Sequence, residues 1–587
     1  MLLFIRYRST VIQTGIISNI PLDSILSPVT RQLFVKSFSD REVYYSNVRI
    51  GVLSREGKID AARKLFDKMP TKDVVTWNSM LTGYWQNGFL QVSKRLFEVM
   101  PVKNVVSWNS MIAGCVENEM VDEAFNYFLA MPEKNTASYN AMISGFVKFD
   151  RMQEAYKLFQ EMPSRNVISY TAMIDGYARN GDMERSRALF DVMPRKNAVS
   201  WTVMISGLVE NGYFVEARKL FEQMPDKNIV AMTAMLTGYC KEGMIKEARI
   251  LFEEIPCRDL VSWNVMITGY AQNGCGEEAL RLFSQMIKTG MQPDELTFVS
   301  IFIACSSLAS LEEGRQAHSL IIKHGFESSL SVCNALVSMY SKCGGILESE
   351  LAFAQISHPD IVSWNTIIAA FAQHGLYGKA VTYFNQMVTV GVQPDGITFL
   401  SLLSTCGHAG KVDESMYFFN LMIHNYGVPP RSEHYACMVD IMSRAGQFHK
   451  ACKIIEEMPF AAESSIWGAL LSSCSIHLNV ELGELAARRI LDLDPNGSGA
   501  YVMLSNLYAA AGKWKEVNRV RIMMREQGVQ KKKAYSWMQI GNDIHHFLGG
   551  DASHPNISDI HNELRRITLH MKVMGDTKEI FFLEAVN

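Results

Sequence analysis

The chain has 587 residues, of which 48% are hydrophobic and 20% are charged, a balance typical of folded rather than disordered protein. The formal net charge of −3 argues against a large basic surface as the main binding determinant, although a locally basic groove is still compatible with nucleic acid. No apolar run approaches the ~20 residues that a membrane-spanning helix needs.

The N-terminal 22 residues contain no acidic side chain, and they carry Arg6 and Arg8 among serines and threonines. This composition resembles an organelle transit peptide, since basic residues interrupt the apolar runs and no secretory hydrophobic segment is present. We expect residues 1–42 to be a transit peptide and lead-in, with the mitochondrion favoured over the plastid. A merely frayed N-terminus is the alternative.

From residue 43 to residue 463 the sequence repeats at fixed intervals, which indicates a stacked repeat protein. Seven prolines recur every 31 residues, at Pro70, Pro101, Pro132, Pro163, Pro194, Pro225 and Pro256. Seven glycines keep the same period, at Gly83, Gly114, Gly145, Gly176, Gly207, Gly238 and Gly269. In such a protein, function usually depends on what varies at fixed positions of each repeat.

Within the unit 74–104, apolar residues fall at helical spacing twice, separated by Gly88 and ended by Pro101. The first stripe is Trp77, Met80, Leu81 and Tyr84, and the second is Val92, Leu96, Phe97 and Met100. Each unit is therefore predicted to be an antiparallel helix pair whose stripes form core. The expected fold is all-α, a right-handed superhelical solenoid of helix-turn-helix repeats.

Units of 31 residues begin at positions 43, 74, 105, 136, 167, 198 and 229, and longer ones begin at 260, 295 and 361. A further short unit begins at 330, and units of 36 and 32 residues complete the array to residue 463. Two units of different consensus occupy 464–497 and 498–531, with Trp467, Leu470, Leu504 and Tyr508 as their expected core. Residues 532–587 depart from the pattern.

Segments such as VVSWNSMIAGCVENEMVDEAFNYFLAMPEKN and LVSWNVMITGYAQNGCGEEALRLFSQMIKTGMQPD resemble pentatricopeptide (PPR) repeats. The alternation of unit lengths resembles the plant PLS subclass. Residues 464–531 resemble its two E motifs, which are related to tetratricopeptide repeats, and 532–587 resembles a partial E+ extension without a complete DYW domain. The resemblance implies a protein that reads single-stranded RNA at one base per repeat.

In this family the fifth residue of each unit and its last residue read the base, and stacking brings both to one edge of the groove. We expect the fifth residue to lie in the first turn of the first helix. The candidate RNA-binding pairs are Asn47 with Asp73, Asn78 with Asn104, Asn109 with Asn135, Asn140 with Asn166, Thr171 with Asn197, Thr202 with Asn228, Thr233 with Asp259, Asn264 with Asp294, Asn334 with Asp360, and Asn365 with Asp395.

Helix capping is the alternative explanation of these residues, because it also selects Asn, Asp and Thr. Capping accounts for the last position, which precedes a helix, but not for the fifth, which lies inside one and avoids better helix formers. An ionised Asp only accepts hydrogen bonds, so it suits the ring N–H of uracil or guanine, whereas an Asn amide can donate to cytosine or adenine. By the family code, Asn at the fifth position selects pyrimidines and Thr selects purines.

From 5′ to 3′ the pairs then predict U, Y, Y, Y, A, A, G, U, N, U, U, where Y is C or U. The unread N belongs to Val299 with Ser329, and the last two repeats depart from the code with Leu400 and Arg431, then Ala436 and Glu463. Apolar residues at the second position of the units are expected to stack on the bases. They include Val75, Val106, Ile168, Val199, Val230, Val261 and Val362.

Relatives of this subclass often end in a zinc deaminase, which needs an H-x-E motif and paired cysteine ligands. His561 and Glu563 spell H-x-E, but no cysteine follows Cys474. We therefore expect these two residues to be exposed on a helix, and we expect no catalytic residue, no metal and no cofactor. The eleven cysteines contain no C-x-x-C pair, which favours buried packing residues over disulfides or zinc ligands.

The resemblance implies a specificity factor that selects cytidines for C-to-U editing in organelle transcripts. A DYW-type cytidine deaminase, with editing accessory proteins, would act in trans. One alternative is an RNA stabilisation, splicing or translation factor without an editing role. Another is a protein scaffold of the tetratricopeptide kind, which has no use for the paired Asn, Thr and Asp residues.

Overall fold

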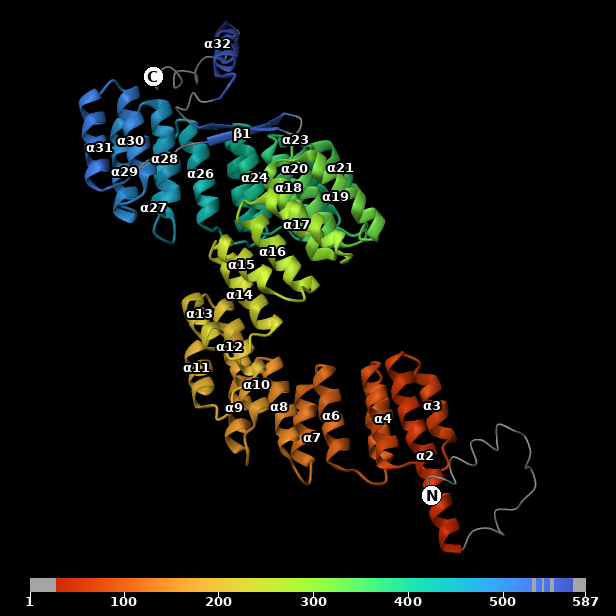
Figure 1. Ribbon diagram of the computed structural model, residues 1–587. Helices are drawn as coiled ribbons and strands as arrows, with labels where there is room; N and C mark the ends of the chain where they lie inside the picture. The colour runs from red at the N-terminus through yellow and green to blue at the C-terminus, as the bar shows by residue number, and fades with distance from the viewer. Residues whose placement is uncertain (1–27, 530–534, 541–542, 549–553, 574–587) are drawn as a thin grey trace. The chain divides into compact units, whose positions relative to one another are not determined.

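The computed structural model describes residues 28–529, 535–540, 543–548 and 554–573 (Figure 1). The predicted transit-peptide segment, residues 1–22, lies outside them. Contacts divide the chain into two compact units, with the boundary between Ala304 and Cys305 inside helix α18. Up to residue 529 both units consist of helices in consecutive pairs, so the predicted helical-repeat fold is confirmed.

Outside the helix that contains the unit boundary, the first helix of each pair packs against the first helix of the next pair. These first helices are α2 (Pro28–Arg55), α4 (Val74–Gln86), α6 (Val105–Glu117), α8 (Thr136–Lys148), α10 (Val167–Arg179), α12 (Ala198–Glu210), α14 (Ile229–Lys241), α16 (Leu260–Gln272), α18 (Glu295–Leu308), α20 (Leu330–Lys342), α22 (Ile361–Gln373), α24 (Gly396–His408), α26 (Ser432–Arg444), α28 (Ser464–His477) and α30 (Ser498–Ala510).

The second helices alternate with them along the chain. They are α3 (Ile59–Lys68), α5 (Leu90–Val99), α7 (Val121–Ala130), α9 (Met152–Glu161), α11 (Met183–Val192), α13 (Phe214–Gln223), α15 (Ile245–Glu254), α17 (Gly276–Lys288), α19 (Leu311–His324), α21 (Ile346–Ala354), α23 (Tyr377–Thr389), α25 (Val412–His424), α27 (Phe448–Glu457), α29 (Val480–Leu493) and α31 (Trp514–Glu526).

From α4 onward, every first helix begins at the first residue of a unit defined by the sequence spacing. The first pair differs, because α2 begins at Pro28 rather than at residue 43. Gly88 follows α4 with a φ of +81°, a left-handed conformation that glycine adopts without steric cost and that ends the helix. The second helix of this pair then ends before Pro101, as the sequence predicts.

Six of the eight residues predicted for the core stripes of unit 74–104 are buried, namely Met80, Leu81, Tyr84, Leu96, Phe97 and Met100. Trp77 is half-buried, and Val92 is exposed. Its neighbour Ser93 takes the buried position and donates a hydrogen bond to the backbone carbonyl of Leu81, 3.1 Å away. A small hydroxyl that bonds to the facing helix fits there where the branched side chain of valine does not, so a hydrophobicity pattern alone misplaces the stripe by one residue.

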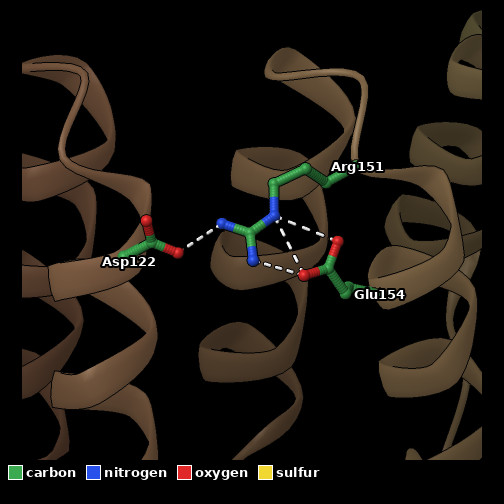
Figure 2. A network of polar contacts seen from close by, with 3 residues as sticks. All are labelled: Asp122, Arg151 and Glu154. Atoms are coloured by element: carbon green, nitrogen blue, oxygen red, sulfur yellow. Dashed lines mark hydrogen bonds and ion pairs between the residues drawn. The ribbon is translucent and has the colours of Figure 1, made fainter.

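Polar side chains also connect successive repeats. Figure 2 shows Arg151, just before α9, between Asp122 on α7 and Glu154 on α9. Its guanidinium donates to Asp122 at 2.5 Å and lies 4.9 Å from the centre of the Phe146 ring. Ion pairs of this exposed kind contribute less than about 1 kcal/mol each, so most of the stability comes from the apolar faces.

The C-terminal part leaves the helix-pair pattern. Strands β1 (Tyr535–Ile540) and β2 (Asp543–Leu548) form an antiparallel hairpin, in which Tyr535 pairs with Leu548, and helix α32 (Ile557–Val573) follows.

All eleven cysteines are free, and five of them are buried, whereas Cys257 is exposed. None of the helices in the described ranges is both long and apolar enough to cross a membrane.

Candidate nucleic-acid interface

The last residue of a unit caps the first helix of the next unit. Asn104 accepts a hydrogen bond from the backbone N–H of Ser107 at 3.0 Å, and its own N–H donates to the Ser107 hydroxyl at 3.3 Å. The bond from a backbone N–H to the side chain of the last residue is present as well at Asp73, Asn135, Asn166, Asn197, Asn228, Asp259, Asp294, Asp360 and Asp395. The return bond cannot form at Asn228, because its partner is Ala231. Capping is therefore a real role of this position, and it fixes where the side chain points.

The fifth residue reaches this cap from within its own unit. From α4 onward each first helix begins at the first residue of its unit, so the fifth residue opens the second turn, one position beyond the expected first turn. Asn47 lies far inside α2, which begins at Pro28. The side-chain amide of the fifth residue donates to the cap in Asn47–Asp73 at 3.2 Å, Asn78–Asn104 at 3.4 Å, Asn140–Asn166 at 3.2 Å, Asn264–Asp294 at 2.9 Å and Asn365–Asp395 at 3.0 Å.

Two further predicted pairs are joined in other ways. In Thr202–Asn228 the amide of Asn228 donates to the Thr202 hydroxyl at 3.1 Å. Burial alone would raise the pKa of Asp360, but the backbone and hydroxyl of Ser363 and the nearby Asn334 side chain together hold that pKa below its usual value.

Three predicted pairs, Asn109–Asn135, Thr171–Asn197 and Thr233–Asp259, have no bond between their side chains among the described residues. The Thr171 hydroxyl instead donates to the carbonyl of Val167 on its own helix at 2.7 Å. The Thr233 hydroxyl oxygen is buried without a partner.

The fifth-position asparagines are nearly buried, yet several of their carbonyl oxygens have no partner. Asn264 is only 2% exposed. The unpartnered buried oxygens are the Oδ1 atoms of Asn47, Asn78, Asn109, Asn140 and Asn334. An unsatisfied buried acceptor costs about 1–3 kcal/mol. A polar residue with spare hydrogen-bonding capacity therefore recurs at the fifth position of these five units.

Beside most of these pairs, the second residue of the unit exposes an apolar side chain. Val75 and Val106 are each 58% exposed, although the other apolar residues of their helices are buried or half-buried. In the unit that begins at residue 330 this position is Ser331. Exposed residues at the equivalent position are Ile168, Val199, Val230, Val261, Leu296, Val362 and Ile397. These side chains provide an exposed apolar surface next to most of the polar pairs.

A row of basic residues adjoins the caps, and the sequence analysis missed it. The second-last position of seven consecutive units carries Lys72, Lys103, Lys134, Arg165, Lys196, Lys227 and Arg258. Each cationic group lies 4.6 to 5.4 Å from the centre of a phenylalanine ring of its own unit. The 31-residue period of these cations was the signal that could have revealed them.

At the C-terminus, His561 and Glu563 are exposed on α32, and Glu563 pairs with Arg566. Within the described ranges, no group of three or more His, Cys, Asp or Glu side chains is arranged to hold a metal ion. In the units 464–497 and 498–531, Leu470 and Tyr508 are buried as predicted, while Trp467 and Leu504 are partly buried.

Family models match most of this repeat array. The PPR repeat model matches residues 46–74, 75–105, 106–136, 168–197, 199–229, 230–260, 397–426 and 433–460. The PPR repeat family model matches 134–168, 258–307 and 359–408, and the E motif model matches 477–539.

Curated relatives in Arabidopsis thaliana carry the same kind of repeat. The chloroplastic pentatricopeptide repeat-containing protein At3g49170 is 41% identical over 292 residues, which is 50% of this chain and 34% of that protein. The mitochondrial protein At3g02330 is 39% identical over 295 residues, 50% of this chain and 33% of that one. The chain thus matches about a third of the length of these relatives.

Solved structures of similar proteins include the maize pentatricopeptide repeat protein PPR10. It is 19% identical with a TM-score of 0.49, over 82% of this chain and 84% of that chain. PPR10 has also been solved in complex with an 18-nt psaJ RNA element, and this structure is 18% identical with a TM-score of 0.46, over 83% and 84% of the two chains.

Proposed function

Because the chain belongs to the pentatricopeptide repeat family, we propose that it is a sequence-specific single-stranded RNA-binding factor of a plant organelle. It selects cytidines for C-to-U editing and recruits a DYW-type cytidine deaminase in trans. The observation that carries the RNA-binding part is the polar pair formed by the fifth and last residues, repeated along both compact units beside an exposed apolar side chain.

The chemistry of the pair suits a nucleobase edge. A carboxylate or amide at the cap accepts or donates at one atom of the base, and the fifth residue offers a second group next to it. The apolar side chain at the second position supplies a surface for the face of the base. A protein-binding scaffold would not need the same two polar positions in each repeat.

Charge supports the same assignment. The net charge of −3 makes general attraction to a polyanion weak, but the row from Lys72 to Arg258 places one cation per repeat next to the caps. Cations that contact phosphates position a nucleic acid without reading its sequence. RNA affinity should accordingly fall as salt is raised.

The editing role and the partner rest on the C-terminal region. The E motif match and the hairpin with α32 that follows it are extra to what RNA binding requires. We assign 464–531 to the E motifs and 532–587 to a partial E+ extension, and together they are the proposed surface for the deaminase and accessory proteins. The N-terminal segment is assigned to targeting, to the mitochondrion in preference to the plastid.

Two experiments test this proposal. Fluorescence anisotropy should show tight binding to an RNA containing U-Y-Y-Y-A-A-G-U-N-U-U, and weak binding to the same bases in scrambled order. Organellar RNA sequencing of a line lacking the protein should show lost editing at one or a few cytidines that lie just downstream of such a match. Intact editing with a lost, unspliced or untranslated transcript would instead favour a non-editing RNA factor.

A further inference from the structure

The four Asn–Asp pairs that would read uracil are not alike. Two of the pairs belong to 31-residue units, Asn47–Asp73 and Asn334–Asp360. The other two belong to 35-residue units, Asn264–Asp294 and Asn365–Asp395. In the short units the Oδ1 atom of the asparagine is buried without a partner. In the long units a third residue bonds to that oxygen.

This third residue is the threonine at the third position of the following helix. The Thr297 hydroxyl lies 2.6 Å from Oδ1 of Asn264, and the Thr398 hydroxyl lies 2.5 Å from Oδ1 of Asn365. The same hydroxyls lie 2.8 Å from Oδ1 of Asp294 and 3.0 Å from Oδ1 of Asp395, so the single proton of each is shared between the asparagine and the cap. At the same time the amide of Asn264 donates to both carboxylate oxygens of Asp294, at 2.9 and 3.0 Å. Both ends of the side-chain amide are therefore held.

Thr76 provides a natural comparison within the same chain. It occupies the equivalent position after Asn47–Asp73, is fully buried, and completes a capping box with Asp73. Its hydroxyl donates to Asp73 at 2.7 Å, and Asn47 keeps an unpartnered oxygen. A threonine at this position is thus not sufficient for the contact with asparagine.

The two kinds of pair also differ in unit length. The second helix of the long units has 13 residues, against 10 in α3, and the two members of the pair are 30 rather than 26 residues apart. The amide-to-carboxylate distance is 2.9 Å for Asn264 and 3.0 Å for Asn365, against 3.2 Å for Asn47. The threonine contact with asparagine therefore accompanies the long units and the shorter distance.

On these contacts, and resting on the proposed function, we propose that Thr297 and Thr398 are positioning residues that make the long-unit pairs more selective for uracil over cytosine. Cytosine presents an amino donor where uracil presents a carbonyl acceptor. An asparagine can accept from that amino group only if its carbonyl oxygen turns toward the base. The threonine already occupies this oxygen, and rotating the amide would also break its bond to Asp294 or Asp395.

The test is the ratio of dissociation constants for RNAs with C or U at one nucleotide, measured by anisotropy on the full chain. The eighth nucleotide of the predicted tract faces Asn264–Asp294, and the first faces Asn47–Asp73. Thr297→Val removes the hydroxyl but keeps the shape of the side chain. Because one hydrogen bond is lost, this variant should lower the C-to-U ratio, that is, the Kd for the C-containing RNA divided by the Kd for the U-containing RNA, by about 5-fold at the eighth nucleotide.

Two matched variants separate this effect from loss of the cap. Thr297→Ser keeps the hydroxyl and should retain the ratio within about twofold. Thr76→Val breaks an equivalent capping box, but it should change the C-to-U ratio at the first nucleotide by less than about twofold. Thr398→Val should lower the ratio at the eleventh nucleotide as Thr297→Val does at the eighth. Circular dichroism checks that the variants are folded.

The inference would be overturned if Thr297→Val left the C-to-U ratio unchanged, or if Thr297→Ser lowered the ratio as much as Thr297→Val. Either result would leave RNA binding by the wild-type chain, and so the proposed function, intact. If the wild-type chain binds neither RNA, the proposed function itself fails, and the inference fails with it.

Discussion

Gly207 on α12 lies directly against Ala178 on α10, and a Cβ atom added to Gly207 would stand 2.6 Å from the Ala178 Cβ. This distance is shorter than any normal contact between carbon atoms. The glycine period in the sequence thus marks where successive first helices approach most closely. Gly114 is similarly close to Trp85, and Gly269 is similarly close to Cys240.

We predict that Gly207→Ala destabilises the first compact unit by about 1–3 kcal/mol, because overpacking forces the two helices apart. Urea unfolding followed by circular dichroism measures the change. Gly51→Ala is the control, since Gly51 lies in helix α2 with nothing within 4 Å of the added Cβ. It should stabilise by about 0.5–1 kcal/mol, and a neutral Gly207→Ala would contradict the packing argument.

A second contact joins the same two helices. The amide of Asn211, at the end of α12, donates to the backbone carbonyls of Ala178 and Gly207, both at 2.8 Å. Asn211→Ala should destabilise the chain by about 1–2 kcal/mol, since it leaves carbonyls of two helix ends without this donor. Thermal unfolding with the wild type as reference measures the effect.

Histidine should replace this asparagine at little cost. At the equivalent position of later repeats, His374 bonds to the carbonyl of Ser341 at 2.9 Å, and His477 bonds to that of Arg444 at 2.8 Å. Asn211→His is therefore expected to recover most of the stability that Asn211→Ala loses. If both variants unfold at the same temperature, the interhelical contact is not what stabilises this junction.

The cap at Asp395 predicts a dependence of stability on pH. Burial alone would raise the pKa of Asp395, but hydrogen bonds from the Thr398 backbone, the Asn365 amide and the Thr398 hydroxyl together outweigh it and hold the pKa below its usual value. A carboxyl group with a lowered folded-state pKa stabilises the fold above its unfolded-state pKa of about 3.9, and it loses this contribution as pH falls through the folded-state value.

Asp395→Asn removes this titration while keeping a side chain that can cap the helix. Unfolding midpoints measured from pH 6 to pH 2 should therefore fall less steeply in the variant than in the wild type. The difference should appear below about pH 4 and vanish at neutral pH, apart from a constant offset. Parallel curves over the whole range would show that Asp395 does not contribute through its charge.

The sequence was sufficient to predict the helix starts because the residues that set them are local. A cap such as Asn104 and its Ser107 partner are three residues apart, and the proline that ends each short unit recurs at a fixed spacing. The face of α5 was less predictable, because the buried Ser93 is polar and the exposed Val92 is apolar. Only the geometry of the facing helix determines which of the two is buried.

The sequence was sufficient to locate the proposed base-reading residues, but not to predict which side chains they contact. The bond from Thr297 to Asn264 spans 33 residues, across a unit whose second helix, α17, has 13 residues. In the sequence, the runs PDELT and PDGIT contain the two threonines that make this contact, but DVVT has a threonine at the same place that does not. The hairpin of β1 and β2 lies beyond the repeats, so periodicity carries no information about it.

The measurement that tests the account most directly is a designed change of base preference at one repeat. Thr171→Asn combined with Asn197→Asp converts the pair of that repeat into the type found at Asn47–Asp73. The fold should be unaffected, because Asp73 caps its helix as Asn197 does. Anisotropy with RNAs that differ only at the fifth nucleotide should show a change of preference from A to U, with preferences elsewhere unchanged. An unaltered preference for A, or equal loss of affinity for all four bases, would contradict base reading by these pairs.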